Sequence, residues 1–124
     1  MIVYCCPDLI FATKIHSTAE ALGIACRPAR DAAMLTDRLN RVDDGKGCEP
    51  VTGVIVDLTM GESALDLIDL AKRHPDKPRV IAYAPHVEVA MLEAAEKHGA
   101  DKTLPRGAFS ATLPDLLSEL AGAT

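Results

Sequence analysis

One aspartate, Asp57, stands where an α/β sheet would place a reactive or regulatory group. It directly follows the apolar residues 54–56 and precedes Leu58 and Thr59. A short apolar run predicts a buried strand, and in an open parallel sheet the carboxyl ends of the strands form the edge at which ligands and reactive groups lie. The sequence therefore predicts that the Asp57 carboxylate lies at the functional edge of a central strand.

Two adjacent cysteines, Cys5 and Cys6, close the first apolar run and are candidate nucleophiles. A nucleophilic thiol needs a lowered pKa, and one that attacks phosphate also needs donors that cradle the anion. Residues 7–12 (PDLIFA) supply neither an arginine nor a loop of small or hydroxyl residues, and an aspartate beside the thiol would raise its pKa. We therefore expect the thiols in apolar segments to be buried and inert, and only Cys48 to be accessible. The thiols expected to be buried are Cys5, Cys6 and Cys26.

The sequence carries no signature of a metal or nucleotide cofactor. Its four histidines show no structural zinc spacing with one another or with the cysteines, and no glycine-rich phosphate fingerprint follows the first apolar run. His74 and His98 come near predicted helix ends, where a cation suits the helix dipole. We expect no cofactor.

Apolar segments that predict strands alternate with amphipathic segments that predict helices. We predict strands at residues 2–6, 24–27, 51–58, 79–84 and 102–104. Helices are predicted to begin near Asp8, Asp31, Ser63, Pro85 and Thr112, the last in a capping box with Asp115. The polar residues 43–50 are predicted to be a mobile connection. Five strands alternating with five helices predict a single α/β domain over residues 1–124, with a doubly wound five-stranded parallel sheet and helices on both faces.

The composition argues against several classes of function. Of the 124 residues, 48% are hydrophobic and 25% are charged, as in ordinary globular domains. The formal net charge of -5 argues against general electrostatic binding to nucleic acid. No basic leader opens the sequence and no apolar run approaches the length of a membrane span. We therefore expect a cytoplasmic protein with reduced thiols and no membrane contact.

The chain resembles the receiver domain of bacterial response regulators, the CheY-like superfamily. The resemblance rests on residues 54–57 with Met60 three positions later, on residues 99–101, and on residues 104–106 before the last helix. It covers essentially the whole chain and implies a flavodoxin-like topology and a place in two-component (phosphorelay) signal transduction. In that family the aspartate that ends the third strand accepts a phosphoryl group, and Asp57 matches it.

The first departure from the family pattern concerns its magnesium ion. Family members hold the ion with two acidic residues after the first strand, where this sequence has Cys6 and Pro7. Magnesium requires hard oxygen ligands, which thiols do not replace. Only Asp57, the carbonyl of Thr59 and Asp8 would remain as ligands, so we predict that no metal binds.

Two further departures affect the groups that contact the phosphoryl group in the family. Ala84 matches a serine or threonine of the family, and the adjacent Tyr83 must face the other side of its strand. Arg106 matches a lysine of the family, and its guanidinium favours a bidentate contact with a carboxylate. We therefore predict that Asp57 forms an ion pair with Arg106 in place of a phosphorylation site.

The sequence thus predicts a degenerate pseudo-receiver. This would be a stand-alone, non-enzymatic signalling domain that acts without phosphorylation, by binding a protein partner or by self-association. By family analogy the interaction face comprises the fourth helix, the fifth strand and the fifth helix. Its candidate residues are Val89, Leu92, Tyr83 and His86.

Two alternatives remain open. The first is a working phosphoacceptor that uses Asp57 in an atypical site, in which case magnesium would be its cofactor. The second is a cysteine-dependent phosphotransfer enzyme. Sugar phosphotransferase IIB components and low-molecular-weight tyrosine phosphatases also place a cysteine after the first strand of a flavodoxin-like sheet.

Overall fold

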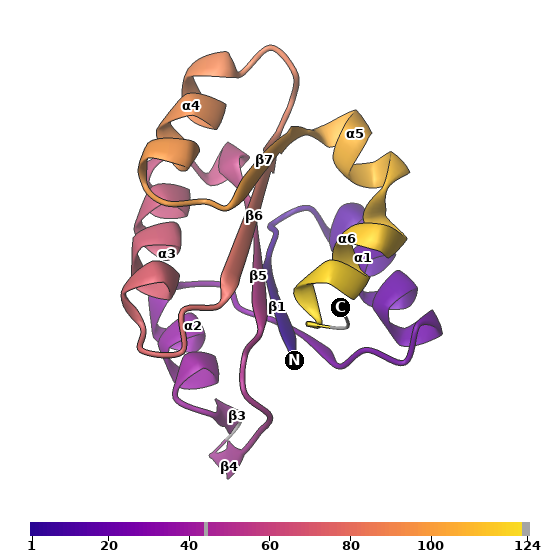
Figure 1. The fold of residues 1–124 in the computed structure, drawn as a ribbon, viewed down its shortest axis with the longest axis vertical. Coiled ribbons are helices and arrows are strands. Elements are labelled where there is room, and N and C mark those ends of the chain that lie inside the picture. Colours follow the sequence, from indigo (N-terminus) through magenta and orange to yellow (C-terminus); the bar gives the residue numbers. More distant parts are fainter. Residues whose placement is uncertain (44, 123–124) are drawn as a thin grey trace.

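The computed structural model describes residues 1–43 and 45–122 and has a five-stranded parallel sheet at its centre (Figure 1). The strands are β1 (Ile2–Cys5), β2 (Cys26–Pro28), β5 (Gly53–Asp57), β6 (Arg79–Ala84) and β7 (Lys102–Pro105). Their order in the sheet is β2-β1-β5-β6-β7. Because all four pairings are parallel and the order reverses after β2, the predicted doubly wound sheet is confirmed.

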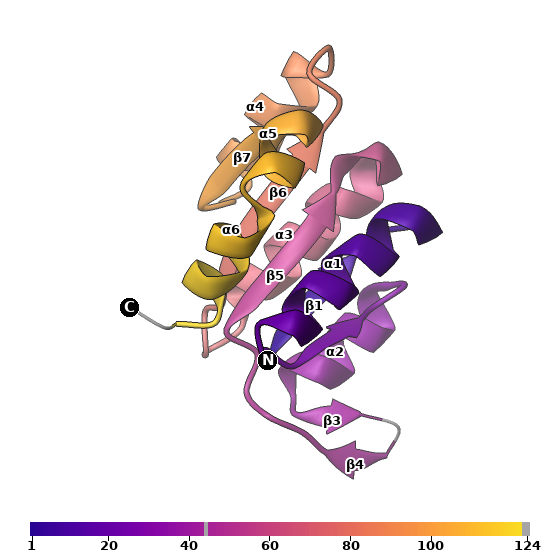
Figure 2. The ribbon, with the colours of Figure 1, turned by 90° about the vertical axis from the view of Figure 1, so that its right-hand side faces the viewer.

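Helices cover both faces of this sheet (Figures 1 and 2). One face carries α1 (Leu9–Ala21), α5 (Arg106–Ala111) and α6 (Leu113–Leu120), and the other carries α2 (Ala32–Leu39), α3 (Glu62–Arg73) and α4 (Val89–Lys97). A 3-10 turn, η1 (Leu58–Met60), directly follows β5. None of the helices in the described ranges is long and apolar enough to cross a membrane.

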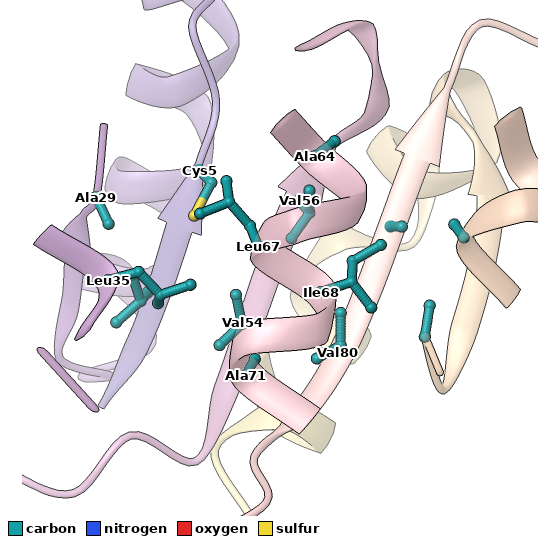
Figure 3. Close-up of a cluster of buried hydrophobic side chains, with 14 of the residues drawn as sticks. Cys5, Ala29, Leu35, Val54, Val56, Ala64, Leu67, Ile68, Ala71 and Val80 are labelled. Atoms are coloured by element: carbon teal, nitrogen blue, oxygen red, sulfur yellow. The ribbon is translucent and has the colours of Figure 1, made fainter. Parts of the chain in front are cut away.

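Alternating side chains along the strands build two separate cores. The core toward α2, α3 and α4 contains small and branched strand residues, with Val54, Val56 and Val80 packed against Leu67 and Ile68 (Figure 3). The opposite core takes the larger strand residues Ile2, Tyr4, Ile55, Ile81 and Tyr83. Tyr83 and Ala84 therefore lie on opposite faces of the sheet, as the strand period requires.

Two predicted helix starts are confirmed by their hydrogen bonds. The Asp8 carboxylate accepts from Ile10 N at 2.9 Å and from Phe11 N at 3.2 Å, at the start of α1. The Asp31 carboxylate accepts from Met34 N at 2.9 Å, at the start of α2. Each aspartate satisfies backbone amides that have no partner within the first helical turn.

Two other helices start within one residue of the predicted position, but their predicted side-chain caps are wrong. Helix α3 begins directly after Gly61, whose φ of 68° suits a residue without a side chain, so Ser63 lies inside the helix. The Thr112 hydroxyl donates to Ala108 O at 2.8 Å and makes no capping bond to α6. Thr112 directly precedes α6, as predicted, and it also follows α5, a short helix that we did not predict and that fully buries Phe109.

The polar connection also differs from its prediction. Within and beside residues 43–50, β3 (Val42–Asp43) and β4 (Lys46–Gly47) pair as a short antiparallel hairpin. The hairpin is continued by Cys48 N, which donates to Arg41 O at 2.9 Å. Residue 44, which also belongs to the predicted mobile connection, lies outside the described residues.

Gly53, at the start of β5, leaves no space for a side chain. A Cβ atom at this position would lie 2.6 Å from Leu120 Cβ and 2.9 Å from Leu120 Cδ2 in α6. We expect Gly53→Ala to lower the free energy of unfolding by about 1–3 kcal/mol, because overpacking a dense core forces the backbone or its neighbours to move. Urea denaturation measures this change.

Gly107→Ala is the matched control for this prediction. Gly107 lies in α5, and a Cβ atom there would meet nothing within 4 Å. Since alanine is the better helix former, this variant should be neutral or more stable by up to about 1 kcal/mol. Equal stability of the two variants would contradict the predicted clash.

Candidate functional site

Asp57 ends β5, the central strand of the sheet, and is only 1% exposed. Its Oδ1 atom accepts hydrogen bonds from Thr59 N at 2.9 Å and from Thr59 Oγ1 at 2.8 Å. A buried carboxylate needs such donors, and here they also cap η1. The carboxylate therefore lies at the predicted edge of the sheet, but one of its oxygens is engaged in holding the following turn.

The second oxygen of Asp57 belongs to a hydrogen-bond chain across three neighbouring strands. Cys6, directly after β1, places its Sγ 3.7 Å from Asp57 Oδ2, and the Tyr83 hydroxyl of β6 donates to the same sulfur at 3.0 Å. The sulfur also lies 3.5 Å from Asp8 O. Strand register brings these groups together. Asp57 of β5 is paired with Tyr83 of β6, and β1, which leads to Cys6, pairs with β5 on the side opposite to β6.

Tyr83 was predicted to belong to an exposed interaction face, and this is wrong. The residue is 0% exposed. Its ring stacks on Phe109 at a centroid distance of 4.4 Å and lies 5.1 Å from the Phe11 ring. One sequence signal could have placed it in the site, because a tyrosine at the end of a buried strand needs a partner for its hydroxyl.

The surroundings of Cys6 keep its thiol protonated at neutral pH. Burial is the largest cause and raises the pKa of Cys6. The hydrogen bond from the Tyr83 hydroxyl and the backbone of Asp8 oppose this rise, and the Asp57 carboxylate adds to it. Burial also raises the pKa of the Tyr83 hydroxyl. A protonated thiol can donate toward Asp57 but is a weak nucleophile. The sulfur is nevertheless only half-buried, whereas full burial was predicted.

The prediction that Asp57 and Arg106 form an ion pair is wrong. The Arg106 guanidinium lies over the Phe11 ring, 5.8 Å from its centroid, and Arg106 Nε has no hydrogen-bond partner within the described residues. The carboxylate instead faces Thr59 and Cys6. The start of α5 places Arg106 against an aromatic face, where a cation–π contact replaces the expected ion pair.

Asp57→Asn and Arg106→Met should therefore act independently on stability. We expect Arg106→Met to change the free energy of unfolding by less than about 1 kcal/mol, because methionine keeps the apolar contact with Phe11, and removing a buried Nε without a partner in the described residues offsets the lost cation–π contact. The double variant should equal the sum of the single variants to within about 0.5 kcal/mol. Urea unfolding of the unmodified protein, the two single variants and the double variant measures this coupling. If the double variant loses clearly less stability than the sum of the two single losses, the two side chains interact and the ion pair exists.

Solved structures with the same arrangement of elements are response regulators. The receiver domain of NtrX from Brucella abortus matches with a TM-score of 0.76 and 20% identity, covering 100% of this chain and 99% of that one. A response regulator from Thermotoga maritima matches with a TM-score of 0.74 and 16% identity, covering 98% and 96%. The chain has the receiver-domain fold. No protein-family model and no curated protein sequence matches it.

A third receiver-fold structure carries the modification that the resemblance implies. It is a response regulator protein from Burkholderia pseudomallei with a phosphorylated aspartic acid, a calcium ion and citrate. It matches with a TM-score of 0.69 and 24% identity, covering 98% of this chain and 68% of that one. At these identities the likeness establishes the fold.

The residues that this receiver fold brings to Asp57 do not fit a magnesium ion. The Cys6 thiol faces Asp57 where an oxygen ligand would be needed, and the Asp8 carboxylate caps α1. Ala84 is 1% exposed and has no hydroxyl. In the described part of the chain, no three His, Cys, Asp or Glu side chains form a group that could hold a metal ion.

The other residues predicted for the interaction face lie around the start of α4. Val89 is 56% exposed and His86 is also exposed, whereas Leu92 is partly buried against the core beneath α4. Val87, predicted on the inner side of this helix, is 70% exposed because the helix begins only at Val89. These residues leave an exposed apolar patch, Val87 and Val89, before and at the first turn of α4.

Proposed function

We propose that this chain is a receiver-like signalling domain of the two-component type that acts through protein–protein contacts and without phosphorylation of Asp57. The observation that carries the proposal is the state of the Asp57 carboxylate. It is 1% exposed, with Oδ1 accepting two hydrogen bonds from Thr59 and Oδ2 facing the Cys6 thiol. In this role the domain is not an enzyme, and its four unpaired cysteines suit the reducing cytoplasm.

The charges around Asp57 favour this proposal over phosphoryl transfer. Phosphoryl transfer depends mostly on positioning and on cations that stabilise the charge of the transferred group. Asp57 is surrounded by a protonated thiol and the tyrosine hydroxyl bound to it, while Arg106 lies over Phe11. A phosphoryl group on Asp57 Oδ2 would have to displace the Cys6 thiol.

The exposed apolar patch of Val87 and Val89 supports a role in protein contact. Apolar side chains that stay exposed beside a helix start are candidates for an interface with a signalling partner or with a second copy of the chain. Val87→Asp with Val89→Asp should abolish such an association. Analytical ultracentrifugation distinguishes self-association from binding to a partner, because only the former depends on the concentration of this chain alone.

The decisive experiment treats the protein with acetyl phosphate and magnesium. We expect intact-mass spectrometry to show no phosphoryl adduct, because the Cys6 thiol faces Asp57 where an oxygen ligand would be needed and the Arg106 guanidinium lies over Phe11. A phosphorylatable receiver treated in parallel shows that the reagents work. An adduct that disappears in Asp57→Asn would overturn the proposal and establish the alternative, a phosphoacceptor with an atypical site.

The cysteine-dependent enzyme remains a second alternative and has its own test. Its nucleophile would be Cys6, which is half-buried and reachable. Since the surroundings raise the thiol pKa, we expect iodoacetamide to modify Cys6 slowly at neutral pH. Fast modification with an alkylation pKa below the ordinary cysteine value would support the enzyme.

A further inference from the structure

A groove runs along the outer edge of the sheet, between α1 and the segment that joins β2 to α2. It has a volume of about 540 Å³ and includes Thr13 and Arg27 in its walls. A narrower cavity of about 320 Å³ continues it and reaches Met60 of η1. The two cavities share Tyr4, Cys6, Leu9, Pro28 and Arg30, so they form one continuous depression.

The groove lies where open α/β sheets bind ligands. It is formed at the carboxyl ends of β1 and β2, and β1 borders the point at which the strand order reverses. Ligands of doubly wound sheets bind outside the carboxyl ends of the strands near this point. Cys6 lines the groove and also contacts Asp57, so an occupant of the groove would lie beside the hydrogen-bond chain.

The charge of the groove is opposite to that of the chain. Arg27 and Arg30 both line it, and no aspartate or glutamate of the described residues lines either cavity, although the whole chain has a net charge of -5. Arg30 is exposed and makes no ion pair within the described residues; its Nε lies 3.4 Å from Met34 Sδ. The neighbouring Asp31 directs its carboxylate to the amide that starts α2.

The remaining surface of the groove is apolar. Leu9 is 81% exposed at its mouth, and Pro28 and Met60 line its length. An exposed leucine beside an exposed guanidinium suits a ligand with an apolar body and an anionic end. The exposed Arg30 guanidinium would receive a carboxylate, sulfonate or phosphate better than a neutral group.

We propose that this groove binds a small amphipathic anion, with its apolar body against Leu9, Pro28 and Met60 and its anionic group at Arg30. The proposal goes beyond protein–protein contact and does not depend on the phosphorylation state of Asp57. It gives the receiver-like fold a small-molecule input next to Cys6.

The test is a fluorescence titration with 1-anilinonaphthalene-8-sulfonate, an aromatic anion, and with its uncharged analogue N-phenyl-1-naphthylamine. We expect saturable binding of the sulfonate at one site, with a Kd that rises about tenfold in Arg30→Gln, because a charge-assisted contact is lost. The uncharged analogue should bind Arg30→Gln and the unmodified protein equally. Leu9→Gln should weaken both probes.

Two variants control for nonspecific effects of charge and of exposed apolar surface. Arg73→Gln removes an exposed arginine of α3, and Val87→Gln removes an exposed apolar side chain near α4; neither should change the Kd. Unfolding midpoints verify that all variants fold, which their exposed positions favour. Bound sulfonate should also slow the alkylation of Cys6, since Cys6 lines the groove.

Three results would overturn the proposal. The first is an equal loss of affinity in Arg30→Gln and Arg73→Gln, which shows a general charge effect. The second is binding that is weakened by Val87→Gln and unchanged by Leu9→Gln, which places the probe near α4. The third is binding that does not saturate or that leaves Cys6 alkylation unchanged.

Discussion

Above about pH 9 the protein should lose stability steeply, because folding buries two thiols in their neutral form. Cys5 is 0% exposed and Cys26 is 6% exposed. Burial is the main cause that raises the pKa of Cys5 from 9.0 to about 12, and it raises the pKa of Cys26 by the same amount. The unfolded chain therefore releases these protons near pH 9, whereas the folded chain holds them to about pH 12.

The sign of the effect follows from proton binding. Below the unfolded pKa both states are protonated at these thiols, so their contribution does not change with pH. Between the two pKa values the unfolded state binds fewer protons, and each thiol lowers the free energy of unfolding by about 1.4 kcal/mol per pH unit. Two thiols acting over part of this range would remove much of a typical total of about 5–15 kcal/mol. Burial of Tyr4 and Tyr83 adds to the loss at still higher pH, since it raises both pKa values.

Urea denaturation at a series of pH values, with a reductant present, measures this slope. Cys26→Ala should reduce the slope by about 1.4 kcal/mol per pH unit, since one buried thiol is removed. Cys48→Ala is the matched control, because its thiol lies beside β4 in the polar connection and outside both cores. If Cys26→Ala leaves the slope unchanged, the alkaline loss has another origin.

Removing the Tyr83 ring should have the largest effect of any substitution at the site. We expect Tyr83→Ala to lower the free energy of unfolding by about 3–5 kcal/mol, as for other large aromatic side chains removed from a core. Tyr83 is 0% exposed, and the substitution deletes its stack on Phe109 and its contact with Phe11. Urea or thermal unfolding measures this loss.

Tyr83→Phe separates the ring from the hydroxyl. It keeps both ring contacts and removes only the hydrogen bond to Cys6 Sγ, so we expect a loss of about 0.5–1.5 kcal/mol. Because that hydrogen bond lowers the pKa of Cys6, its removal should raise the pKa and slow the alkylation of Cys6. Faster alkylation in Tyr83→Phe, with the fold intact, would show that the hydroxyl shields the sulfur and does not stabilise its thiolate.

Most of the fold could be predicted because strand and helix patterns are local. The predicted strand at residues 79–84 coincides with β6, and Asp8 caps α1 as expected. The short helix α5 was missed because its six residues are too few to show a helical period. It is stabilised by Phe109, which is buried against Tyr83 from a distant part of the chain.

The placement of Asp57 at a strand end is likewise local, but its partners are not. The ends of β5 and β7, which lie on either side of β6, bring Asp57 and Arg106 to the same edge of the sheet. The predicted ion pair assumed that side chains at this shared edge would be in contact. The carboxylate instead binds the nearest donors, the amide and hydroxyl of Thr59. Phe11 provides a surface for the guanidinium that no spacing in the sequence reveals.

The sequence by itself determined the alternation of strands and helices, the parallel sheet and the carboxylate at the end of its central strand, because apolar runs, periods and caps act over a few residues. Only the tertiary structure decided that Tyr83 is buried, that Cys6 joins it to Asp57, and that Arg106 stays apart. The contact between Tyr83 and Cys6 spans 77 positions of the chain, and the contact between Cys6 and Asp57 spans 51. They depend on strand register and on the direction of each side chain, which are set when the sheet and both helical layers pack together.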